Sequence, residues 1–548
     1  MTQRTLFRFF SAGLFCLLII GGCDSSDPNG GNEEEEIPIE AARSIDVSIN
    51  TNEGRQAISP YIYGSNQELS STDAFTVRRI GGNRLTGYNW ENDYSNAGED
   101  WMHSSDIFLL NNSGLTESSA QSAVVMTNFH DQSIAMGAES IITLQMAGYV
   151  AADKNGNVSA GQTAPSFRWK QVAFTKNAPF DTQPDRTDDT VYMDEFVQFM
   201  VNRYGSASSE TGVQWYSLDN EPGLWASTHP RIYPEQLKVT DLVDRSIELA
   251  LAVKAVDPDA KIVGPALYGF AAYETLQGAP DWEQEQTGKW FIEYYLDKMR
   301  EAEQTHGMRL LDVLDVHWYP EARGDNRITL NDGTETTKDA LARLQAPRTL
   351  WDASYVEDSW IGQWKQAFLP LIPTLHESIE SYYPGTKLGI TEYNYGAGNS
   401  ISGGLAQVDV LGVFGTSDIH LATLWRLNGE HRYASSAFKL FRDYDGQGSV
   451  YGNTAVLVDL ADKETFSVYA SIHDDNDEQL HIMVVNKHME DATAFTFNTE
   501  SSTSYSEADI WFFDQRSPLV QQASSQSISG SAFTYTVPAQ TAMHFVLK

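Results

Sequence analysis

Cysteine is almost absent from this chain of 548 residues, which contains only Cys16 and Cys23, both close to the N-terminus. The chain after residue 23 can therefore form neither a disulfide nor a thiolate metal site. Positive charge is also scarce, because 37 Lys and Arg face 74 Asp and Glu, which gives a formal net charge of −37. Such a surface repels the phosphates of nucleic acids, so we expect no nucleic-acid partner. This excess of negative charge suits an exported protein that acts on a neutral polymer.

Several catalytic motifs are missing from the sequence. It contains no Gly-Xaa-Ser-Xaa-Gly elbow, no His-Glu-Xaa-Xaa-His helix and no Gly-rich loop that would cradle a phosphate. We expect no required cofactor. The acidic residues Asp93, Glu99 and Asp100 are candidates for a structural Ca²⁺ site, although they lack the fixed spacing of a calcium-binding loop.

The first 22 residues have the composition of an export signal. Arg4 and Arg8 precede an apolar run from Phe9 to Ile20, which is too short to span a bilayer comfortably. The run leads into Gly21-Gly22-Cys23, which resembles the bacterial lipoprotein box, where the cysteine is lipidated and becomes the new N-terminus. A plain cleaved signal with a chance cysteine is the alternative. From the resemblance to the lipoprotein box, we expect a signal peptide over residues 1–22 and a cell-envelope lipoprotein that faces the periplasm or the cell exterior.

The next segment changes from apolar to acidic. Ser, Asp, Asn, Gly, Glu and Pro dominate residues 24–40, which hold almost nothing to bury, so we predict a flexible tether over residues 23–42. Residues 43–60 follow, and Ile45, Val47 and Ile49 alternate there with polar residues as in a half-buried strand.

Residues 61–445 alternate short apolar runs with long amphipathic stretches. Phe196, Phe199 and Met200, for example, share one helical face that Gly205 would end. This alternation predicts an α/β fold, a (β/α)₈ TIM-like barrel. The eight predicted strands cover residues 61–66, 76–83, 141–147, 214–221, 261–267, 314–319, 388–394 and 420–425.

Helical periodicity ends near Gly446. Short alternating runs separated by Ser, Asn and Asp then predict an antiparallel β-sandwich domain over residues 446–548, which residues 43–60 would join. The sandwich carries no catalytic cluster. We expect it to brace the barrel, with sugar binding as the weaker alternative.

Two glutamates carry the strongest chemical signal. Glu221 closes the fourth predicted strand and Glu392 lies near the end of the seventh. Active sites of such barrels lie at the carboxyl ends of the strands, so the two carboxylates should meet there. A pair of carboxylates is what glycoside hydrolysis requires, because one protonates the leaving oxygen while the other attacks or shields the sugar carbon.

Other residues at the strand ends are candidates for substrate binding or support. Asn220 could donate to a sugar hydroxyl, and Tyr393 or Tyr395 could hydrogen-bond Glu392. Arg84 could hold Glu392 anionic or simply tie down a loop. His317 could orient a carboxylate, or be an ordinary structural histidine. Loop tryptophans are candidate sugar platforms. The remaining candidates are Asn83, Trp90, Trp225, Trp318, Tyr319 and Trp425.

At these residues the chain resembles glycoside hydrolase family 44. The resemblance rests on Gly81–Arg84 with Tyr88–Asn92, Tyr216–Trp225, His317–Ala322, and Thr391–Gly396 with Ile401–Gly404, and it extends from about Ile45 to the C-terminus. It implies a (β/α)₈ barrel with a β-sandwich, and endo-attack on β-1,4-glucans such as xyloglucan or carboxymethylcellulose with retention of configuration. By motif, Glu221 would be the acid/base and Glu392 the nucleophile.

Two other functions fit the same residues. One is hydrolysis of β-mannan or xylan by the same glutamates. The other is a surface lipoprotein that binds glucan without cleaving it. In each case we expect a monomer with a polysaccharide ligand and a membrane attachment through Cys23.

Overall fold

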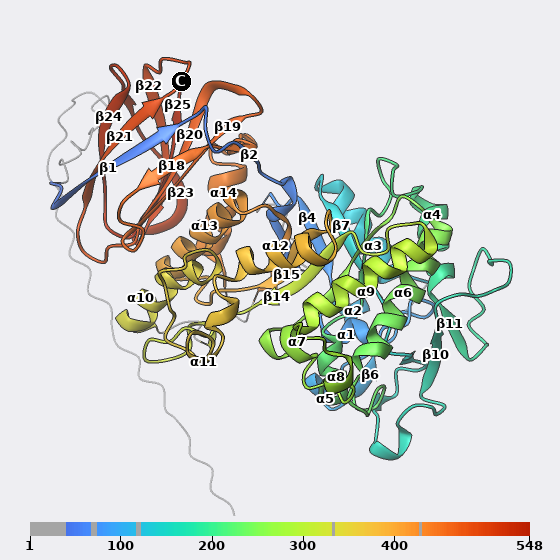
Figure 1. The fold of residues 1–548 in the computed structure, drawn as a ribbon. Helices are drawn as coiled ribbons and strands as arrows, with labels where there is room; N and C mark the ends of the chain where they lie inside the picture. The colour runs from blue at the N-terminus through green and yellow to red at the C-terminus, as the bar shows by residue number, and fades with distance from the viewer. Residues whose placement is uncertain (1–39, 67–73, 117–121, 331–334, 427–429) are drawn as a thin grey trace, which may run out of the picture. The chain divides into compact units, whose positions relative to one another are not determined.

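The computed structural model describes residues 40–66, 74–116, 122–330, 335–426 and 430–548. Eight parallel strands close into a barrel in the order β12-β13-β14-β15-β16-β3-β4-β7 (Figure 1). Their bounds are β3 (Gly64–Asn66), β4 (Val77–Ile80), β7 (Glu139–Leu144), β12 (Trp215–Leu218), β13 (Lys261–Leu267), β14 (Val313–Trp318), β15 (Lys387–Tyr393) and β16 (Ile419–Leu424). The predicted barrel is confirmed, and each predicted strand overlaps one observed strand.

Two of the strand ends that differ from the prediction have a clear local cause. Tyr61 lies in a short 3-10 helix (Pro60–Ile62), because Pro60 fixes its own φ angle and the Ser59 side chain accepts a hydrogen bond from the Tyr61 N–H. Asn83 begins the short helix α1 (Asn83–Thr86), because Gly82, at a φ of 89°, turns the chain out of the strand.

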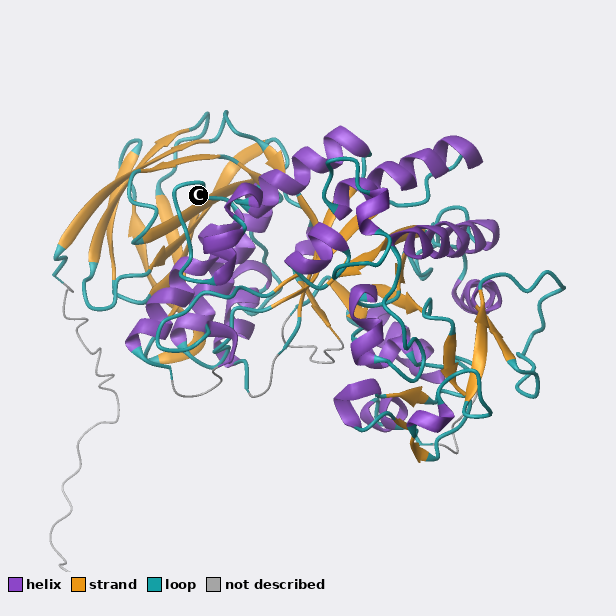
Figure 2. Ribbon diagram, turned by 60° about the horizontal axis from the view of Figure 1, so that its bottom comes forward, coloured by secondary structure: helices purple, strands orange, loops and turns teal. Residues whose placement is uncertain are grey.

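A long helix follows each barrel strand from β4 onward, and these helices surround the strands (Figure 2). They are α3 (Val124–Ala135), α4 (Met193–Tyr204), α6 (Val239–Val256), α9 (Phe291–His306), α12 (Leu371–Tyr382), α13 (Ile401–Thr416) and α14 (Arg432–Arg442). Shorter helices lie in the loops: α2 (Phe108–Asn112), α5 (Trp225–Thr228), α7 (Phe270–Thr275), α8 (Trp282–Glu285), α10 (Thr337–Gln345) and α11 (Trp360–Trp364). Two small loop sheets combine β5 (Ser95–Asn96), β6 (Ser104–Asp106) and β9 (Gly156–Asn157), and β8 (Tyr149–Ala151), β10 (Trp169–Ala173) and β11 (Thr190–Tyr192).

The barrel interior changes from apolar to polar along the strands. One layer is an apolar cluster of Val77, Ile141, Trp215, Val263, Val313 and Leu421. Side chains alternate between the two faces of a strand, so the residues two positions further on also point inward. Those residues are polar and fully buried, and include Arg79, Thr143, Ser217, Asp315 and Thr423. The sequence therefore places buried polar groups directly below the carboxyl ends of the strands.

The sandwich is built from both ends of the described chain. One sheet has the order β18 (Leu457–Leu460), β1 (Arg43–Asn50), β21 (Thr493–Glu500), β24 (Ala532–Val537). The other has the order β2 (Gln56–Ala57), β17 (Thr454–Ala455), β19 (Phe466–His473), β20 (Asn476–Asn486), β25 (Thr541–Leu547), β22 (Glu507–Asp514), β23 (Ser517–Ser527). Figure 1 shows β1, in blue, among strands coloured orange and red. The pairing of β1 with β21 is parallel, whereas that with β18 is antiparallel.

The barrel and the sandwich share a buried contact. Met483 and Phe513 of the sandwich belong to the same apolar cluster as the barrel helices. At this contact Lys487 forms a buried ion pair of 2.8 Å with Asp409 of α13, and the Tyr469 hydroxyl donates to the same carboxylate at 2.5 Å. These buried charges hold the two parts in register only while both partners are present.

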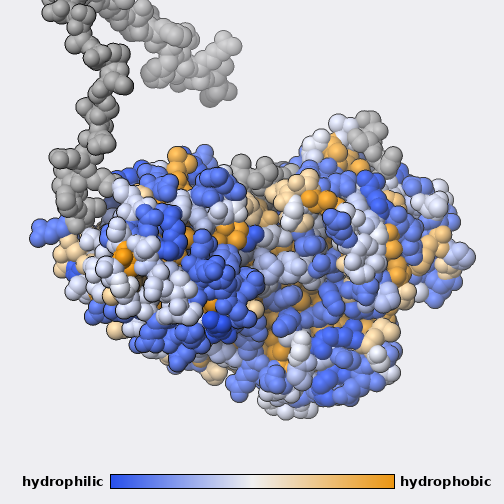
Figure 3. Space-filling view, turned by 90° about the horizontal axis from the view of Figure 1, so that it is seen from above, coloured by the Kyte–Doolittle hydropathy of each residue, from blue (hydrophilic) through white to orange (hydrophobic). Residues whose placement is uncertain are grey.

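The described surface is largely hydrophilic, as the net charge predicts. In Figure 3 apolar residues form small separate groups on the face shown. None of the helices in the described ranges combines the length and the apolar character that a membrane crossing requires. The predicted signal peptide, Cys23 and nearly all of the predicted tether lie outside the described residues.

Candidate active site

Glu221 is held in a strained turn directly after β12. Its φ of 44° and that of Asp219, 58°, are both in the left-handed region, which is costly for residues other than glycine. The buried Asp219 carboxylate accepts hydrogen bonds from the Met146 and Ala147 N–H groups and from the Thr86 hydroxyl. These bonds tie the turn to neighbouring loops and fix where Glu221 points.

A β-bulge brings Glu392 into the barrel. Ile390 pairs with Val316 and Glu392 pairs with His317, so Thr391 is an extra residue in β15. Ile390 and Tyr393 both pack outward in the main apolar cluster. The residues between them, Thr391 and Glu392, therefore both make contacts inside the barrel, as bulges near active sites often allow.

Two donors stabilise the negative charge of Glu392. Nη1 of Arg79 lies 2.7 Å from Oε1 of Glu392, and the Tyr319 hydroxyl donates to Oε2 at 2.9 Å. Arg79 is fully buried, and its other donors reach Oδ1 of Asn220 at 2.9 Å and Oδ1 of Asn66 at 3.1 Å. A charge-assisted pair of this kind is short and strong, and it fixes the carboxylate in place.

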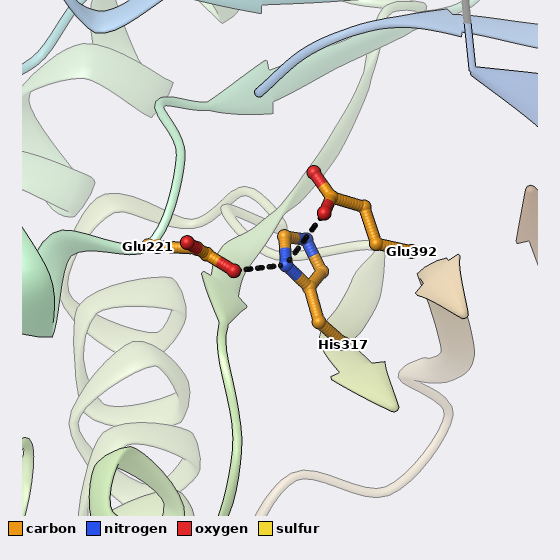
Figure 4. A group of neighbouring side chains, drawn as sticks. All are labelled: Glu221, His317 and Glu392. Carbon is orange, nitrogen blue, oxygen red and sulfur yellow. Dashed lines mark hydrogen bonds and ion pairs between the residues drawn. The ribbon is translucent and has the colours of Figure 1, made fainter. Parts of the chain in front are cut away.

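His317 lies between the two carboxylates (Figure 4). Its Nδ1 atom is 2.9 Å from Oε1 of Glu221 and 3.5 Å from Oε2 of Glu392. Burial lowers the pKa of His317, so the ring is neutral at pH 7. Burial also raises the pKa of Glu221 to about 7, against the effect of the Arg79 charge and with a contribution from Asp100. Glu221 is thus suited to hold a proton, whereas Glu392 lies against the positive charge of Arg79.

The structure places Asn220 next to Arg79, the partner of Glu392, whereas Arg84 points elsewhere. Oδ1 of Asn220 accepts from Arg79 and from the Gly82 N–H, and its Nδ2 donates to Asn83 at 3.4 Å. Arg84 instead donates to Asp106 at 2.5 Å and to Ser95 at 3.1 Å. Of the two roles expected for Arg84, the contact with Glu392 is excluded, because Arg84 lies on α1 beyond the glycine turn. Its bonds to Ser95 and Asp106 instead tie down the small loop sheet.

The predicted aromatic roles need several corrections. Trp90 and Trp225 are fully buried and cannot be sugar platforms, since Trp90 stacks on Phe196 and Trp225 packs against Tyr233. Trp318 is also buried and donates to the Tyr395 hydroxyl at 3.2 Å.

Neither Tyr393 nor Tyr395 makes the expected hydrogen bond to the Glu392 carboxylate. The Tyr393 hydroxyl bonds with Gln407, and Tyr395 is buried with Trp318. The bulge explains the error, because it turns Tyr393 outward onto Phe414. Tyr319 provides the predicted hydrogen bond instead.

Some aromatic rings do remain accessible. Trp425 is half-buried, and its ring lies so close to Gly82 that a Cβ atom there would come within 2.5 Å of it. Trp101 is 62% exposed and Trp364 is 76% exposed. Exposure identifies these two as better candidates for sugar stacking than the buried tryptophans, and sequence alone could not separate the two groups.

The predicted Ca²⁺ residues do not come together. Asp93 is buried and accepts from the N–H groups of Val124 and Val125 at the start of α3, while Glu99 pairs with His103. Within the described ranges, the one group of three or more acidic or histidine side chains close enough to share a metal ion is Glu221, His317 and Glu392. The Arg79 guanidinium beside Glu392 disfavours a divalent cation there, because the two positive charges would repel.

The chain is similar to known glycosidases over most of its length. The model of glycoside hydrolase family 44 matches residues 94–322. Endoglucanase A of Paenibacillus lautus is 52% identical over 93% of this chain and 73% of its own length. The β-mannanase/endoglucanase A of Caldicellulosiruptor saccharolyticus is 48% identical over 90% of this chain, which spans 38% of that protein.

A solved structure agrees with these relatives. A family 44 xyloglucanase of Paenibacillus polymyxa superposes with a TM-score of 0.91 at 51% identity, over 92% of this chain and all of that one. A second structure of the P. polymyxa enzyme contains xyloglucan. With this identity across both the barrel and the sandwich, the chain belongs to glycoside hydrolase family 44.

Proposed function

We propose that this protein hydrolyses β-1,4-glucan backbones internally, with retention of configuration at the anomeric carbon. The distance between the carboxylates carries the proposal. One oxygen of Glu221 and one of Glu392 lie within 4.8 Å of each other. Retaining glycosidases hold their carboxyl groups about 5–5.5 Å apart, whereas inverting enzymes need roughly 6.5–9.5 Å to admit a water.

In the first step, Glu392 attacks the anomeric carbon and forms a glycosyl-enzyme. Glu221 donates its proton to the glycosidic oxygen, which leaves with the rest of the chain. The burial that raises the pKa of Glu221 to about 7 favours its protonated form before this step. Arg79 and Tyr319 donate to Glu392 and orient its carboxylate for attack.

In the second step, Glu221 acts as a base. It takes a proton from water, which then attacks the anomeric carbon from the face that the first sugar left. Glu392 departs as a carboxylate, and its charge returns to the two donors that held it before. This double displacement uses only side chains, and glycosidases of family 44 need no cofactor.

The names of the relatives support a glucan backbone as the substrate. One relative is named an endoglucanase and another a xyloglucanase, and their sequences are 52% and 51% identical to this chain. The exposed rings of Trp101 and Trp364 offer flat apolar surfaces on which glucose units could stack. We propose xyloglucan and carboxymethylcellulose as substrates.

Hydrolysis by purified protein tests this proposal. Wild-type protein should release oligosaccharides from xyloglucan and carboxymethylcellulose, and Glu392→Gln should abolish release. Glu357→Gln is the matched control, because Glu357 is equally buried but its carboxylate accepts from the hydroxyls of Thr349 and Ser359. The anomer first formed, followed by NMR, should be β. An α product would exclude retention, and equal inertness of wild type and Glu392→Gln on glucans that both still bind would favour a non-catalytic binder.

Mannan is the second candidate substrate, because one relative is named as a β-mannanase as well as an endoglucanase. Since that protein is much longer than the matched region, its mannanase activity need not reside there. Rates on mannan and xylan, measured beside those on xyloglucan, decide between the backbones.

We also propose that the protein is attached to a bacterial membrane through a lipid on Cys23. The apolar run before Gly21-Gly22-Cys23 supports this proposal, as does the acidic composition of residues 24–40. Growth with a labelled fatty acid should label the wild type, and Cys23→Ser should abolish the label and release the enzyme from the membrane fraction. An unlabelled wild-type protein would contradict the proposal.

A further inference from the structure

Three inward-facing side chains connect the barrel interior to Glu221. Asp315, Thr391 and His317 are all fully buried. Oδ1 of Asp315 accepts the Thr391 N–H at 3.0 Å, and Oδ2 accepts the Thr391 hydroxyl proton at 2.6 Å. Oγ1 of Thr391 then lies 3.5 Å from Nε2 of His317, a long contact, and Nδ1 of His317 lies 2.9 Å from Glu221.

The direction of these hydrogen bonds follows from the number of protons. A threonine hydroxyl has one proton, and here it points to the Asp315 carboxylate, so Oγ1 can only accept from His317. A neutral imidazole carries one N–H group. If that group is Nε2–H, which faces Thr391, then Nδ1 presents a lone pair to the two glutamates.

We propose that Asp315 and Thr391 are positioning residues that select the Nε2–H tautomer of His317, so that Nδ1 accepts a hydrogen bond from the protonated carboxyl of Glu221. This inference rests on the proposed function in so far as it gives Glu221 the acid/base role. The bulge is essential to it, because the extra residue in β15 is Thr391 itself.

The arrangement favours both steps of the reaction. A hydrogen bond accepted from the neutral carboxyl stabilises the protonated Glu221 that the first step requires. After that proton leaves, the Nδ1 lone pair faces a carboxylate, which strengthens Glu221 as the base of the second step. The titratable and charged groups around the ring are Glu221, Glu392, Asp315 and Arg79. Burial, together with the Arg79 charge, lowers the pKa of His317 against the opposing effect of Glu392 and Asp315.

Asp315→Asn is the sharpest variant, since it is nearly isosteric. Its new amide N–H₂ would donate to Thr391 Oγ1, so the hydroxyl proton would turn toward Nε2 of His317 and move the ring proton to Nδ1. Nδ1–H then stabilises ionised Glu221, so the alkaline limb of the kcat/KM profile should move down by roughly one pH unit. Thr391→Val should shift it in the same direction. The matched control is Thr143→Val, because Thr143 is an equally buried barrel threonine that donates to the Ile80 carbonyl.

Nitrogen NMR of His317 tests the tautomer without any catalysis. With ¹⁵N-labelled histidine, and the His317 signals identified by their loss in His317→Asn, the wild type should show a protonated Nε2 and a bare Nδ1. Asp315→Asn should show the reverse. A wild-type protein with Nδ1–H, or an unchanged tautomer in Asp315→Asn, would overturn the inference. This measurement needs no substrate, so its result does not depend on whether the protein is a glucanase. If a variant does not fold, the spectrum of the wild type alone still tests the tautomer.

Discussion

The guanidinium of Arg79 donates to the carboxylate of Glu392 at 2.7 Å, although 313 residues separate them in the chain. The same guanidinium donates to Asn220, the residue before Glu221. Arg79 thus connects Glu392 of β15 with the turn that carries Glu221. Arg79 lies on β4, which carries neither carboxylate. The positions of the Glu221 and Glu392 carboxylates therefore also depend on how β4 pairs with its neighbours in the barrel.

Replacement of Arg79 by lysine should reduce kcat strongly. Lysine keeps the positive charge, but its single ammonium group lacks the rigid, planar set of N–H donors with which the guanidinium reaches both Glu392 and Asn220. We expect a loss of about 10²–10³-fold, as for other preorganised donors. Arg78→Lys is the control, since Arg78 is equally buried on the same strand but faces Phe129 and Ser133 of α3. It should lower the melting temperature while kcat per folded molecule is retained, and equal kcat losses in both variants would contradict this role.

Tyr319→Phe should slow the reaction without unfolding the protein. It removes the hydroxyl that donates to Glu392 at 2.9 Å, and a hydrogen bond to a charged group contributes about 1.5–3 kcal/mol, or roughly 10–100-fold in rate. Tyr393→Phe loses a hydroxyl bonded to Gln407 instead, so its kcat should stay near the wild-type value. A larger kcat loss in Tyr393→Phe would restore that residue as the partner of Glu392.

Asp100→Asn should move the alkaline limb of the pH–rate profile to lower pH. The negative charge of Asp100 contributes to the raised pKa of Glu221, and its removal makes the proton of Glu221 easier to lose. Because Asp100 is exposed, we expect a shift of only a few tenths of a pH unit, which should shrink further at high salt. Glu99→Gln, which alters a carboxylate paired with His103, should leave the limb in place.

Glu221→Gln should stabilise the fold at alkaline pH. The pKa of Glu221 is raised to about 7 from 4.5, so the unfolded chain loses this proton first as the pH rises. As the pH rises from 4.5 to 7, the folded state loses stability relative to the unfolded chain. Above pH 7 the whole cost of burying the Glu221 charge remains, about 3 kcal/mol at most. The variant should therefore melt higher than the wild type at pH 8 and equally at pH 4. The exposed Glu99→Gln should show no such difference, and a lower melting temperature for Glu221→Gln at pH 8 would contradict the assignment.

The contact between barrel and sandwich should depend on both members of its ion pair. Lys487→Met leaves the buried Asp409 carboxylate without its cation and should cost about 3–5 kcal/mol. The double variant Asp409→Asn/Lys487→Met should recover much of this loss, because no unpaired charge remains. Chemical denaturation of the three proteins measures it, and equal stability of Lys487→Met and wild type would exclude a bracing role for the pair.

Much of the barrel could be predicted because its signals are local. Apolar strands, amphipathic helices and the stop at Gly205 each depend on neighbouring residues, and the two glutamates lie in short motifs at strand ends. Arg79 was missed, although the sequence held a signal for it. It stands two residues after Val77 in a predicted barrel strand, so alternation places both residues on the same face of that strand.

The structural tryptophans were harder to separate from exposed ones. Trp90 and Trp225 lie in loop-like sequence yet are fully buried, whereas Trp364 is 76% exposed. Burial of a loop residue depends on helices that come from elsewhere in the chain, such as Phe196 of α4 against Trp90. No local pattern contains that information.

The sequence by itself determined the fold class, the order of the eight strands and the identity of the two glutamates, because each follows from periodicity and residue type over a few positions. Only the tertiary structure decided how those glutamates differ. The bulge at Thr391 turns Glu392 toward Arg79 and Tyr319, while the half-buried Glu221 lies beside His317. Closure of the barrel joins strands that are distant in sequence, and the charge of each carboxylate depends on those distant partners.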